Sequence, residues 1–261
     1  MNPELREFAQ IPDRYTWISA DVDRYIGDRY GVIQGTVWAG VFGVRAGADE
    51  VEDVLAEVRA RIPPEKETAW WIDPGAEPTD LHERLVALGL EVPETGHTLH
   101  ALACTSEPPP AREGIEVTRV ETFEEFLTAS EVMWDAFGTA PELRVATREE
   151  FDAQQAAGVP VTFLARVDGR PAGVGRSIYS DRGVFLIAGS VAEWARGRGV
   201  YRALVRARWD DAAARGTPAL VTEAMPDTSY PILKRIGFED VCTIRRLKDR
   251  RQSSGSTSPE S

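Results

Sequence analysis

The sequence is poor in cysteine, lysine and histidine. Cys104 and Cys242 are its only cysteines, and neither belongs to a Cys-x-x-Cys or Cys/His spacing. This excludes a disulfide framework and argues against a structural zinc site. Two thiols in a chain of 261 residues are typical of a reducing compartment. All three histidines precede residue 110, so we expect no histidine base in the C-terminal part.

No apolar run is long enough to cross a bilayer. The longest uncharged stretch, residues 31–44, is short and rich in glycine, whereas a membrane-spanning helix needs roughly 20 apolar residues. The charged first residues predict no secretory signal peptide. Acidic side chains outnumber basic ones by 42 to 30, and a field of that sign repels nucleic acid and anionic lipid. We therefore expect a soluble cytoplasmic protein that binds neither nucleic acid nor a membrane.

Three consecutive prolines divide the chain. Residues 108–110 are all proline, and such a semi-rigid segment cannot lie inside a sheet. We therefore predict one domain over residues 1–110 and a second over 111–248. The remainder, 249–261, is rich in Ser, Gly and Thr and has no apolar anchor, which predicts a disordered tail.

The C-terminal part has an α/β pattern. Alternating apolar residues, helical spacing and Gly or Pro at the boundaries define its elements. We expect strands over 115–120, 161–167, 172–179, 184–191, 219–224 and 241–247, and helices over 122–137, 147–157, 199–214 and 229–236. This order predicts a mixed sheet flanked by helices.

The N-terminal part repeats the second half of that order. We expect strands over 32–44, 67–72 and 99–104, and helices over 50–62 and 79–88, the latter capped by Thr79. The segment Leu85–Glu91 matches Leu233–Glu239 in spacing. We interpret the match as an internal duplication; the alternative is a chance recurrence of a common helix-glycine-strand unit.

The segment after Ser190 and Val191 has the composition of an anion-binding turn. An apolar strand ends there, and a loop with Gly197 and Gly199 leads directly into a helix. The first N–H groups of a helix have no partner within it, and its N-terminus carries a partial positive charge. Glycines let the backbone approach a phosphate, and arginines add forked donors. The arginines at this turn are Arg196, Arg198 and Arg202.

The alternative is a solvated helix start with surface arginines. Arginine beside a helix N-terminus is electrostatically unfavourable, so a cluster there favours a site that binds an anion. Two common nucleotide motifs are absent from the sequence, the Gly-x-x-x-x-Gly-Lys-Ser/Thr loop and a Gly-x-Gly-x-x-Gly after a strand. A dinucleotide binder of the Rossmann type is therefore disfavoured.

The segment from Val191 through Arg196–Val200 to Ala203–Leu204 resembles the acetyl-CoA loop of the GCN5-related N-acetyltransferases (GNATs). The order of elements over about 115–247 is also similar to that family. The resemblance implies two GNAT-like domains, each a central mixed β-sheet flanked by helices. It also implies transfer of an acetyl group from the acetyl-CoA thioester to a primary amine by direct attack, with no metal. The residues expected to bind acetyl-CoA are Ser190, Val191, Arg196, Gly197, Arg198, Gly199, Val200, Tyr201, Arg202 and Ser229.

The sequence departs from the family pattern at several positions. Tyr201 stands where the loop usually ends in Gly or Ala, and Leu233 stands where many members have the tyrosine that protonates the thiolate. Tyr230 could replace that tyrosine from the preceding turn; for Tyr230 and Ser229 the alternative is packing and capping. The N-terminal copy resembles tandem members but lacks the loop, its nearest stretch being Phe42–Gly47. We therefore expect it to be degenerate.

An amine acceptor must lose a proton before it attacks. Strand 184–191 contains no acid, so Glu223 and Glu193 are the nearest carboxylates by sequence, and each could instead be solvated. We expect Glu223 and Tyr230 as the catalytic pair, with a backbone N–H near Val191 for the oxyanion. The resemblance implies a small-molecule or peptide amine as the acceptor. We expect either a monomer with an internal pseudo-dimer or a homodimer. The alternative function is a catalytically silent acyl-CoA-binding or regulatory module.

Overall fold

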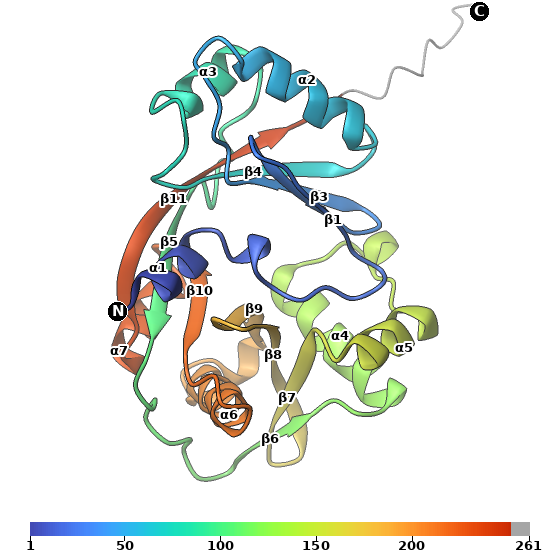
Figure 1. Ribbon diagram of the computed structural model, residues 1–261. Coiled ribbons are helices and arrows are strands. Elements are labelled where there is room, and N and C mark those ends of the chain that lie inside the picture. Colours follow the sequence, from blue (N-terminus) through green and yellow to red (C-terminus); the bar gives the residue numbers. More distant parts are fainter. Residues whose placement is uncertain (252–261) are drawn as a thin grey trace, which may run out of the picture. The chain divides into compact units, whose positions relative to one another are not determined.

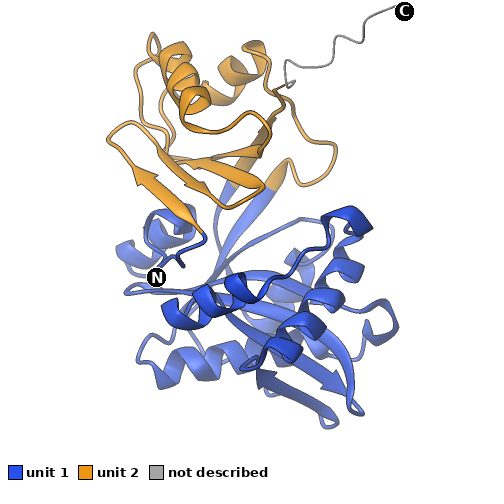
Figure 2. Ribbon diagram, turned by 90° about the vertical axis from the view of Figure 1, so that its right-hand side faces the viewer, with its two compact units in different colours: residues 1–21, 99–243 blue, residues 22–98, 244–261 orange. Residues whose placement is uncertain are grey.

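The computed structural model describes residues 1–251 (Figure 1). The chain forms two compact units, each assembled from two separate segments (Figure 2). Unit 1 contains Met1–Asp21 and Leu99–Thr243, and unit 2 contains Val22–Thr98 and the chain from Ile244. Within the described residues, no helix combines the length and the apolar character needed to cross a bilayer.

Unit 1 is a mixed sheet with helices on both faces. Its strands follow the order β11-β5-β10-β9-β8-β7-β6, in which β9 and β10 are parallel and β6 to β9 are antiparallel neighbours. The strands are β5 (Thr98–Cys104), β6 (Ile115–Arg119), β7 (Val161–Val167), β8 (Arg170–Ser180), β9 (Gly183–Val191), β10 (Leu220–Ala224) and the first part of β11 (Glu239–Asp249). The helices are α1 (Pro3–Gln10), α4 (Phe123–Phe137), α5 (Arg148–Ala157), α6 (Val200–Ala214) and α7 (Tyr230–Ile236).

The two faces of this sheet have separate cores. Leu204 and Val205 of α6 pack on one face, against Val184 and Leu186 of β9. The opposite face is covered by three helices. Buried apolar residues of α4 and α5 pack against Leu164 and Val174, and those of α1 pack against Phe185 and Val221. Because strand residues alternate between faces, these cores indicate the face of the side chains in the regularly paired parts of β7 to β10.

Local signals set the ends of α4. Thr122 accepts a hydrogen bond from the N–H of Glu125, whose side chain accepts from the N–H of Thr122, a complete capping box. The helix ends at Gly138 in the left-handed conformation (φ 65°). The element expected over 122–137 is thus confirmed within one residue.

Unit 2 is a smaller sheet covered by two helices. Its strands follow the order β1-β2-β3-β4-β11, with β3 and β4 parallel. The elements are β1 (Asp23–Ile26), β2 (Gly31–Gln34), β3 (Trp38–Phe42), β4 (Glu67–Ile72), the second part of β11, α2 (Val51–Arg61) and α3 (Leu81–Ala87). Val54, Val58 and Leu85 of the helices pack against Val41 and Trp70 of the sheet.

The compact units differ from the two sequence segments that we expect to be domains. β5 ends the segment 1–110, yet it pairs antiparallel with β10 and lies in unit 1. β11 ends the segment 111–248, yet residues 245–249 pair antiparallel with β4 in unit 2. Each unit therefore holds the last strand of the other segment. Strand pairing decides which residues form a compact unit, and the last strand of each segment pairs within the unit formed mainly by the other segment. The division of the sequence into two copies therefore stays a prediction.

The N-terminal part contains elements that the periodicity did not predict. Helix α1 and strand β1 were not expected, and the strand expected over 32–44 is two antiparallel strands, β2 and β3. The predicted cap Thr79 is wrong, because α3 begins after Asp80 with no side-chain capping bond. Short amphipathic segments with a turn between them give too few residues for a clear period.

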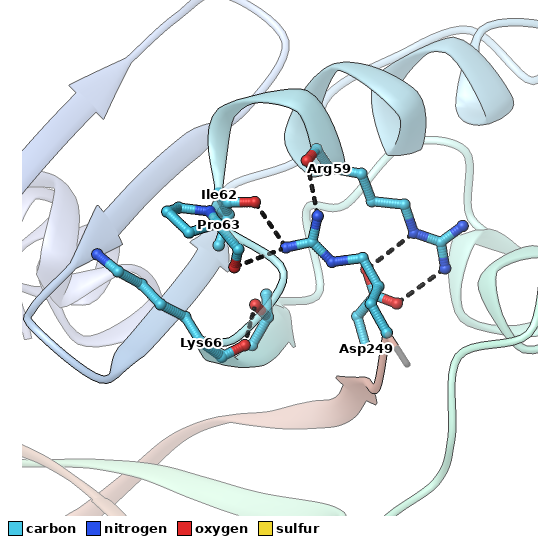
Figure 3. Close-up of polar contacts among 7 residues, drawn as sticks. Arg59, Ile62, Pro63, Lys66 and Asp249 are labelled. Atoms are coloured by element: carbon cyan, nitrogen blue, oxygen red, sulfur yellow. Dashed lines mark hydrogen bonds and ion pairs between the residues drawn. The ribbon is translucent and has the colours of Figure 1, made fainter. Parts of the chain in front are cut away.

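Residues 249–251, which we expected to belong to the tail, form contacts with unit 2. β11 extends to Asp249, whose carboxylate, 1% exposed, accepts two hydrogen bonds from Arg59 at 2.8 and 3.0 Å. The guanidinium of Arg251 donates to the carbonyl groups of Arg59, Ile62 and Pro63 at 2.7–3.1 Å (Figure 3). These polar contacts replace the apolar anchors that the sequence lacks here. The rest of the predicted tail, residues 252–261, lies outside the described residues.

Candidate functional site

The parallel strands β9 and β10 separate part of the way along unit 1. They pair only from Leu220–Val184 to Thr222–Leu186, although β10 continues beside β5 to Ala224 and β9 continues beside β8 to Val191. The Thr222 hydroxyl donates to the carbonyl oxygen of Leu186 at 2.9 Å and closes the paired region. Beyond it, the backbone groups of β9 that face β10 have no strand partner, so they are available to a ligand.

A bulge lies in β9 at this point. Ala188 has a φ of 50°, and the register with β8 shifts between Val174–Ser190 and Arg176–Ile187. Two residues of β9, Ala188 and Gly189, therefore stand opposite one of β8. A bulge turns backbone groups out of the ladder, and bulges are frequent beside functional sites. The two parallel strands thus separate after Leu186, before the end of β9 at Val191, and the bulge lies in the separated part.

The loop after β9 leads directly into α6. A short 3₁₀ turn, Glu193–Ala195, is followed by Gly197 (φ 77°) and Gly199 (φ 98°), backbone conformations that favour glycine. The first bond of the helix runs from the N–H of Ala203 to the carbonyl oxygen of Gly199 at 3.1 Å, and no side chain caps the helix. The N–H groups of residues 200–202 precede that bond. They form the positive end of the helix.

Arginines surround these N–H groups. Arg196 and Arg198 are exposed and Arg202 is half-buried. Within residues 1–251, none of the three has a carboxylate within 4 Å. A fourth, Arg112, lies with its Cδ 3.1 Å from the position that a Cβ on Gly199 would take. Sequence reasoning missed Arg112, because it stands far from the loop in the chain and belongs to no motif.

Tyr201 does not project into the loop. Its ring packs against β9, with Cε2 2.9 Å from the position that a Cβ on Gly189 would occupy. Burial raises the pKa of the Tyr201 phenol, while the positive charge of the buried Arg208 opposes that shift. The bulky side chain at the helix start is thus accommodated by the absence of a side chain at position 189. The space in front of the loop is not filled by this ring.

Glu223 lies where β9 and β10 separate. It directly follows Thr222, the last residue of β10 that pairs with β9. It shares a face of the sheet with Val221, which packs in the core under α1. Glu193, the other candidate base, is exposed in the 3₁₀ turn. Of the two carboxylates, Glu223 lies at the opening between the strands.

Tyr230 lies at the start of α7. Its ring is 4.3 Å from that of His100, measured between centroids, and a hydrogen bond to Asp240 raises the pKa of its phenol. Ser229 stands at the N-cap but makes no side-chain capping bond, so the capping alternative for it is not observed. Leu233 is fully buried in the core under α6. It therefore takes a packing role.

Unit 2 contains a similar strand-loop-helix sequence with different contacts. The stretch Phe42–Gly47 follows β3 and precedes α2. Its arginine, Arg45, donates to the carboxylate of Asp73 at 2.8 and 3.2 Å and to the carbonyl oxygen of Val44 at 2.8 Å. The N–H of Gly47 donates to the carboxylate of Glu50 at 2.6 Å. Protein groups thus occupy the donors of this loop.

Unit 1 therefore combines an opening between two parallel strands, a bulge beside it and a helix N-terminus with unpaired arginines. The opening can take an extended chain, and the helix start can take an anion. Among residues 1–251, no cluster of His, Cys, Asp and Glu has the composition of a metal site.

Comparison with known proteins found similarity in structure only. Neither the models of protein families nor the curated protein sequences gave a match. A GCN5-related N-acetyltransferase from Kribbella flavida superposes with a TM-score of 0.64 at 17% identity, over 95% of this chain and 96% of that one. Another from Sphaerobacter thermophilus gives 0.59 at 18%, over 86% and 81%. A tandem GNAT protein from the clavulanic acid biosynthesis pathway gives 0.60 at 12%, over 96% and 89%. The chain therefore has the fold of the GCN5-related N-acetyltransferases.

Proposed function

We propose that unit 1 is an acetyl-CoA-dependent N-acetyltransferase that moves an acetyl group from the CoA thioester to a primary amine. The observation that carries the proposal is the start of α6, where uncapped N–H groups and unpaired arginines lie next to the opening between β9 and β10. A diphosphate joined to an extended chain fits these two features together. The fold shared with proteins named N-acetyltransferases supports the same function.

The residues of the loop suit a diphosphate. The N–H groups of Val200, Tyr201 and Arg202 would bind its oxygens, and Arg196 and Arg198 would add charge-assisted hydrogen bonds. A Cβ on Gly197 would meet no atom within 4 Å, so the space beside that residue is open. Ser190 and Val191 would bind the pantetheine chain through the backbone of β9. Ser229, on the far side of the opening, remains a proposed contact.

The chemistry needs a base, an oxyanion site and an acid. Acetyl-CoA supplies a thioester that an amine can attack. Glu223 would take the proton from the amine, and the backbone N–H groups at the bulge of β9 would stabilise the oxyanion. The carbon–nitrogen bond forms as the carbon–sulfur bond breaks, and Tyr230 would protonate the departing thiolate. A phenol has an ordinary pKa of about 10, so it carries its proton near neutral pH.

Unit 2 is not expected to bind acetyl-CoA, because its loop donors are already occupied. Our further expectations are a cytoplasmic location, a small-molecule or peptide amine as acceptor, and a monomer with an internal pseudo-dimer or a homodimer. The acceptor class is taken up below.

One observation favours a second candidate, a silent acyl-CoA-binding or regulatory module. Tyr230 directs its hydroxyl to Asp240 and stacks on His100, and Leu233 is buried. A protein without a placed acid could bind acyl-CoA and not turn it over. An assay of free-thiol release with a broad panel of amines distinguishes the two, since amine-dependent release excludes the silent module.

Isothermal titration with acetyl-CoA tests the proposal itself. We expect the wild type to bind, and Arg196→Ala to bind about tenfold more weakly or worse, because one charge-assisted hydrogen bond is worth about 1.5–3 kcal/mol. Arg84→Ala is the matched control, since Arg84 pairs with Asp80 on the surface of unit 2. Absence of binding by the wild type would overturn the proposed function.

A further inference from the structure

Polar side chains line up across unit 1 next to the bulge of β9. Thr162 of β7 stands directly beside Arg176 of β8, and Arg176 stands beside Ile187 of β9. Ile187 packs in the core under α1, so all three side chains are on the face that carries α1, α4 and α5. The next position across the opening on this face is that of Glu223.

Two of these polar groups are buried without a partner. The hydroxyl of Thr162 and the Nε of Arg176 are inaccessible and form no hydrogen bond, and Thr162 is only 5% exposed. Ser190, whose neighbour on β8 is Val174, is on the same face and its buried hydroxyl also has no partner. Leaving a buried donor unpaired is unfavourable, and buried polar groups in native proteins are nearly always paired. Their convergence indicates a polar ligand.

The charges around Arg176 have a definite arrangement. Within the described chain, no carboxylate lies within 4 Å of its guanidinium. Glu150 of α5 and Asp21 lie farther out, where they act on Arg176 through their charges, and burial raises the pKa of Glu150. Gln154 donates to the Glu150 carboxylate at 2.9 Å. Arg176 is thus a half-buried cation near two acids that do not neutralise it by direct contact.

Given the proposed function, on which this inference rests, we propose that the acceptor is an amino acid or a similar small zwitterion. Its carboxylate binds the guanidinium of Arg176 and the hydroxyl of Thr162, and its amine faces Glu223. A guanidinium pairs with a carboxylate through two parallel hydrogen bonds. Glu223, two strands away from Arg176, attracts the ammonium end and orients the molecule.

The spacing of the strands limits the length of this acceptor. Neighbouring strands lie about 4.8 Å apart. Arg176 is one strand away from the bulge of β9, where the acetyl group would be transferred, and two strands away from Glu223. The side chains of Arg176 and Glu223 are on the same face of the sheet, and a small ligand lying over β9 on that face would contact both only if its carboxylate and amine nitrogen are separated by a few bonds. The side-chain amine of a lysine within a peptide chain does not meet this condition.

The competing explanation is a purely structural ion cluster, in which Arg176 is held by Glu150 and Asp21 through water. It predicts no dependence of catalysis on an acid group in the acceptor. It also predicts that a change at Arg176 lowers stability without changing the preference among acceptors.

The test compares amines that differ only in the carboxylate. Free-thiol release is measured with acetyl-CoA and the pairs glycine and methylamine, alanine and ethylamine, and β-alanine and ethylamine. For the wild type we expect kcat/KM to be at least about tenfold higher for the acid-bearing member of one or more pairs. Equal rates, or a preference for the simple amines, would overturn the inference.

Variants of Arg176 and Thr162 then test whether these two residues cause the preference for amines that carry a carboxylate. Arg176→Gln should remove the preference while acetyl-CoA affinity, measured by titration, stays within about twofold. Thr162→Val, which changes volume little, should reduce the preference several-fold and keeps the test open if Arg176→Gln does not fold. Arg182→Gln is the matched control, because Arg182 pairs with Glu7 at the surface. A preference that survives in both cluster variants contradicts the proposal.

Failure of the proposed function and failure of the acceptor inference give different experimental results. If the wild type does not bind acetyl-CoA, the proposed function is wrong and the inference falls with it. If it binds acetyl-CoA and releases thiol with simple amines as fast as with amino acids, only the inference is wrong. Binding without release for any amine excludes the acceptor assignment and favours the silent module.

Discussion

The starts of α6 and α2 show how the same local order of elements gives opposite electrostatic properties. Each helix follows a strand of a parallel pair and a glycine-containing loop. The first turn of α6 has no acidic residue, and Arg196, Arg198 and Arg202 lie around it. The first turn of α2 carries Glu52 and Asp53. Acids at a helix N-terminus compensate its partial positive charge, whereas arginines add to it.

The loops before the two helices differ in the same sense. In unit 2, Arg45 is bound to Asp73, whose side chain is 1% exposed, and the N–H groups of Ala46 and Glu77 donate to carbonyl oxygens within that unit. In unit 1, the helix start has no capping side chain. An arginine near a helix start is therefore not enough for an anion site. Its charge must be left unpaired by the rest of the protein.

The largest effect on acetyl-CoA affinity is expected when the start of α6 is given acidic residues like those at the start of α2. The double variant Arg196→Glu and Arg198→Glu removes two charge-assisted hydrogen bonds, worth about 3 kcal/mol or more together. We expect acetyl-CoA affinity, measured by titration, to fall at least about 100-fold. Acids near the helix start should hold or raise its stability, so the melting temperature serves as the control for folding. A loss smaller than tenfold would contradict the prediction.

The converse change releases the arginine of unit 2 from its partner. Arg45→Ala leaves the buried carboxylate of Asp73 without its cation, and we expect the free energy of unfolding to fall by about 2 kcal/mol. Acetyl-CoA affinity should not change. Chemical denaturation and titration measure the two quantities.

Arg84→Ala is the control for that variant. It removes an exposed pair with Asp80, and we expect a change within about 0.5 kcal/mol. If Arg45→Ala weakened acetyl-CoA binding, the assignment of the site to unit 1 alone would be wrong.

The helix that follows β10 contains a phenol, and the corresponding helix after β4 does not. Helix α7 begins with Tyr230, whereas α3 contains no tyrosine. We expect Tyr230→Phe to lower kcat about tenfold or more if the phenol protonates the thiolate, with acetyl-CoA affinity unchanged. Steady-state thiol release measures this. An unchanged kcat would mean that Tyr230 only packs against His100 and binds Asp240.

The smallest effect is expected from the backbone of the loop. Gly199→Ala forces a side chain onto a φ of 98° and brings its Cβ within 3.1 Å of Arg112, at a cost of about 1–2 kcal/mol. We expect acetyl-CoA affinity to fall several-fold. Gly216→Ala is the matched control, since Gly216 (φ 82°) follows the other end of α6 with nothing within 4 Å. It should lower stability similarly and leave affinity unchanged.

Much of unit 1 could be predicted from local signals. The helices expected over 122–137 and 229–236 and the strand expected over 161–167 follow from neighbouring residues alone, and the structure confirms them within one residue. The loop around Gly197 and Gly199 belongs to the same class, because its conformation depends on the residues of one turn. The first residues of unit 2 could not be predicted as well, since their strands are short.

The contacts of the site depended on distant parts of the chain. Arg112 reaches Gly199 from a loop that has no motif, and Tyr201 fits because position 189 has no side chain. Arg176, Thr162 and Ile187 come together only through the registers of β7, β8 and β9. No spacing in the sequence marks them as a group, because each lies on a different strand.

The sequence by itself determined where helices and strands form between residues 111 and 248 and which turn carries the glycines and arginines, because these depend on interactions among near neighbours. The tertiary structure decided the exchange of β5 and β11 between the units, the bulge in β9 and the row of polar residues beside it. These depend on strand pairing between segments far apart in the chain. A shift of one residue in register would turn Arg176 to the opposite face, so only the assembled sheet determines what that side chain can bind.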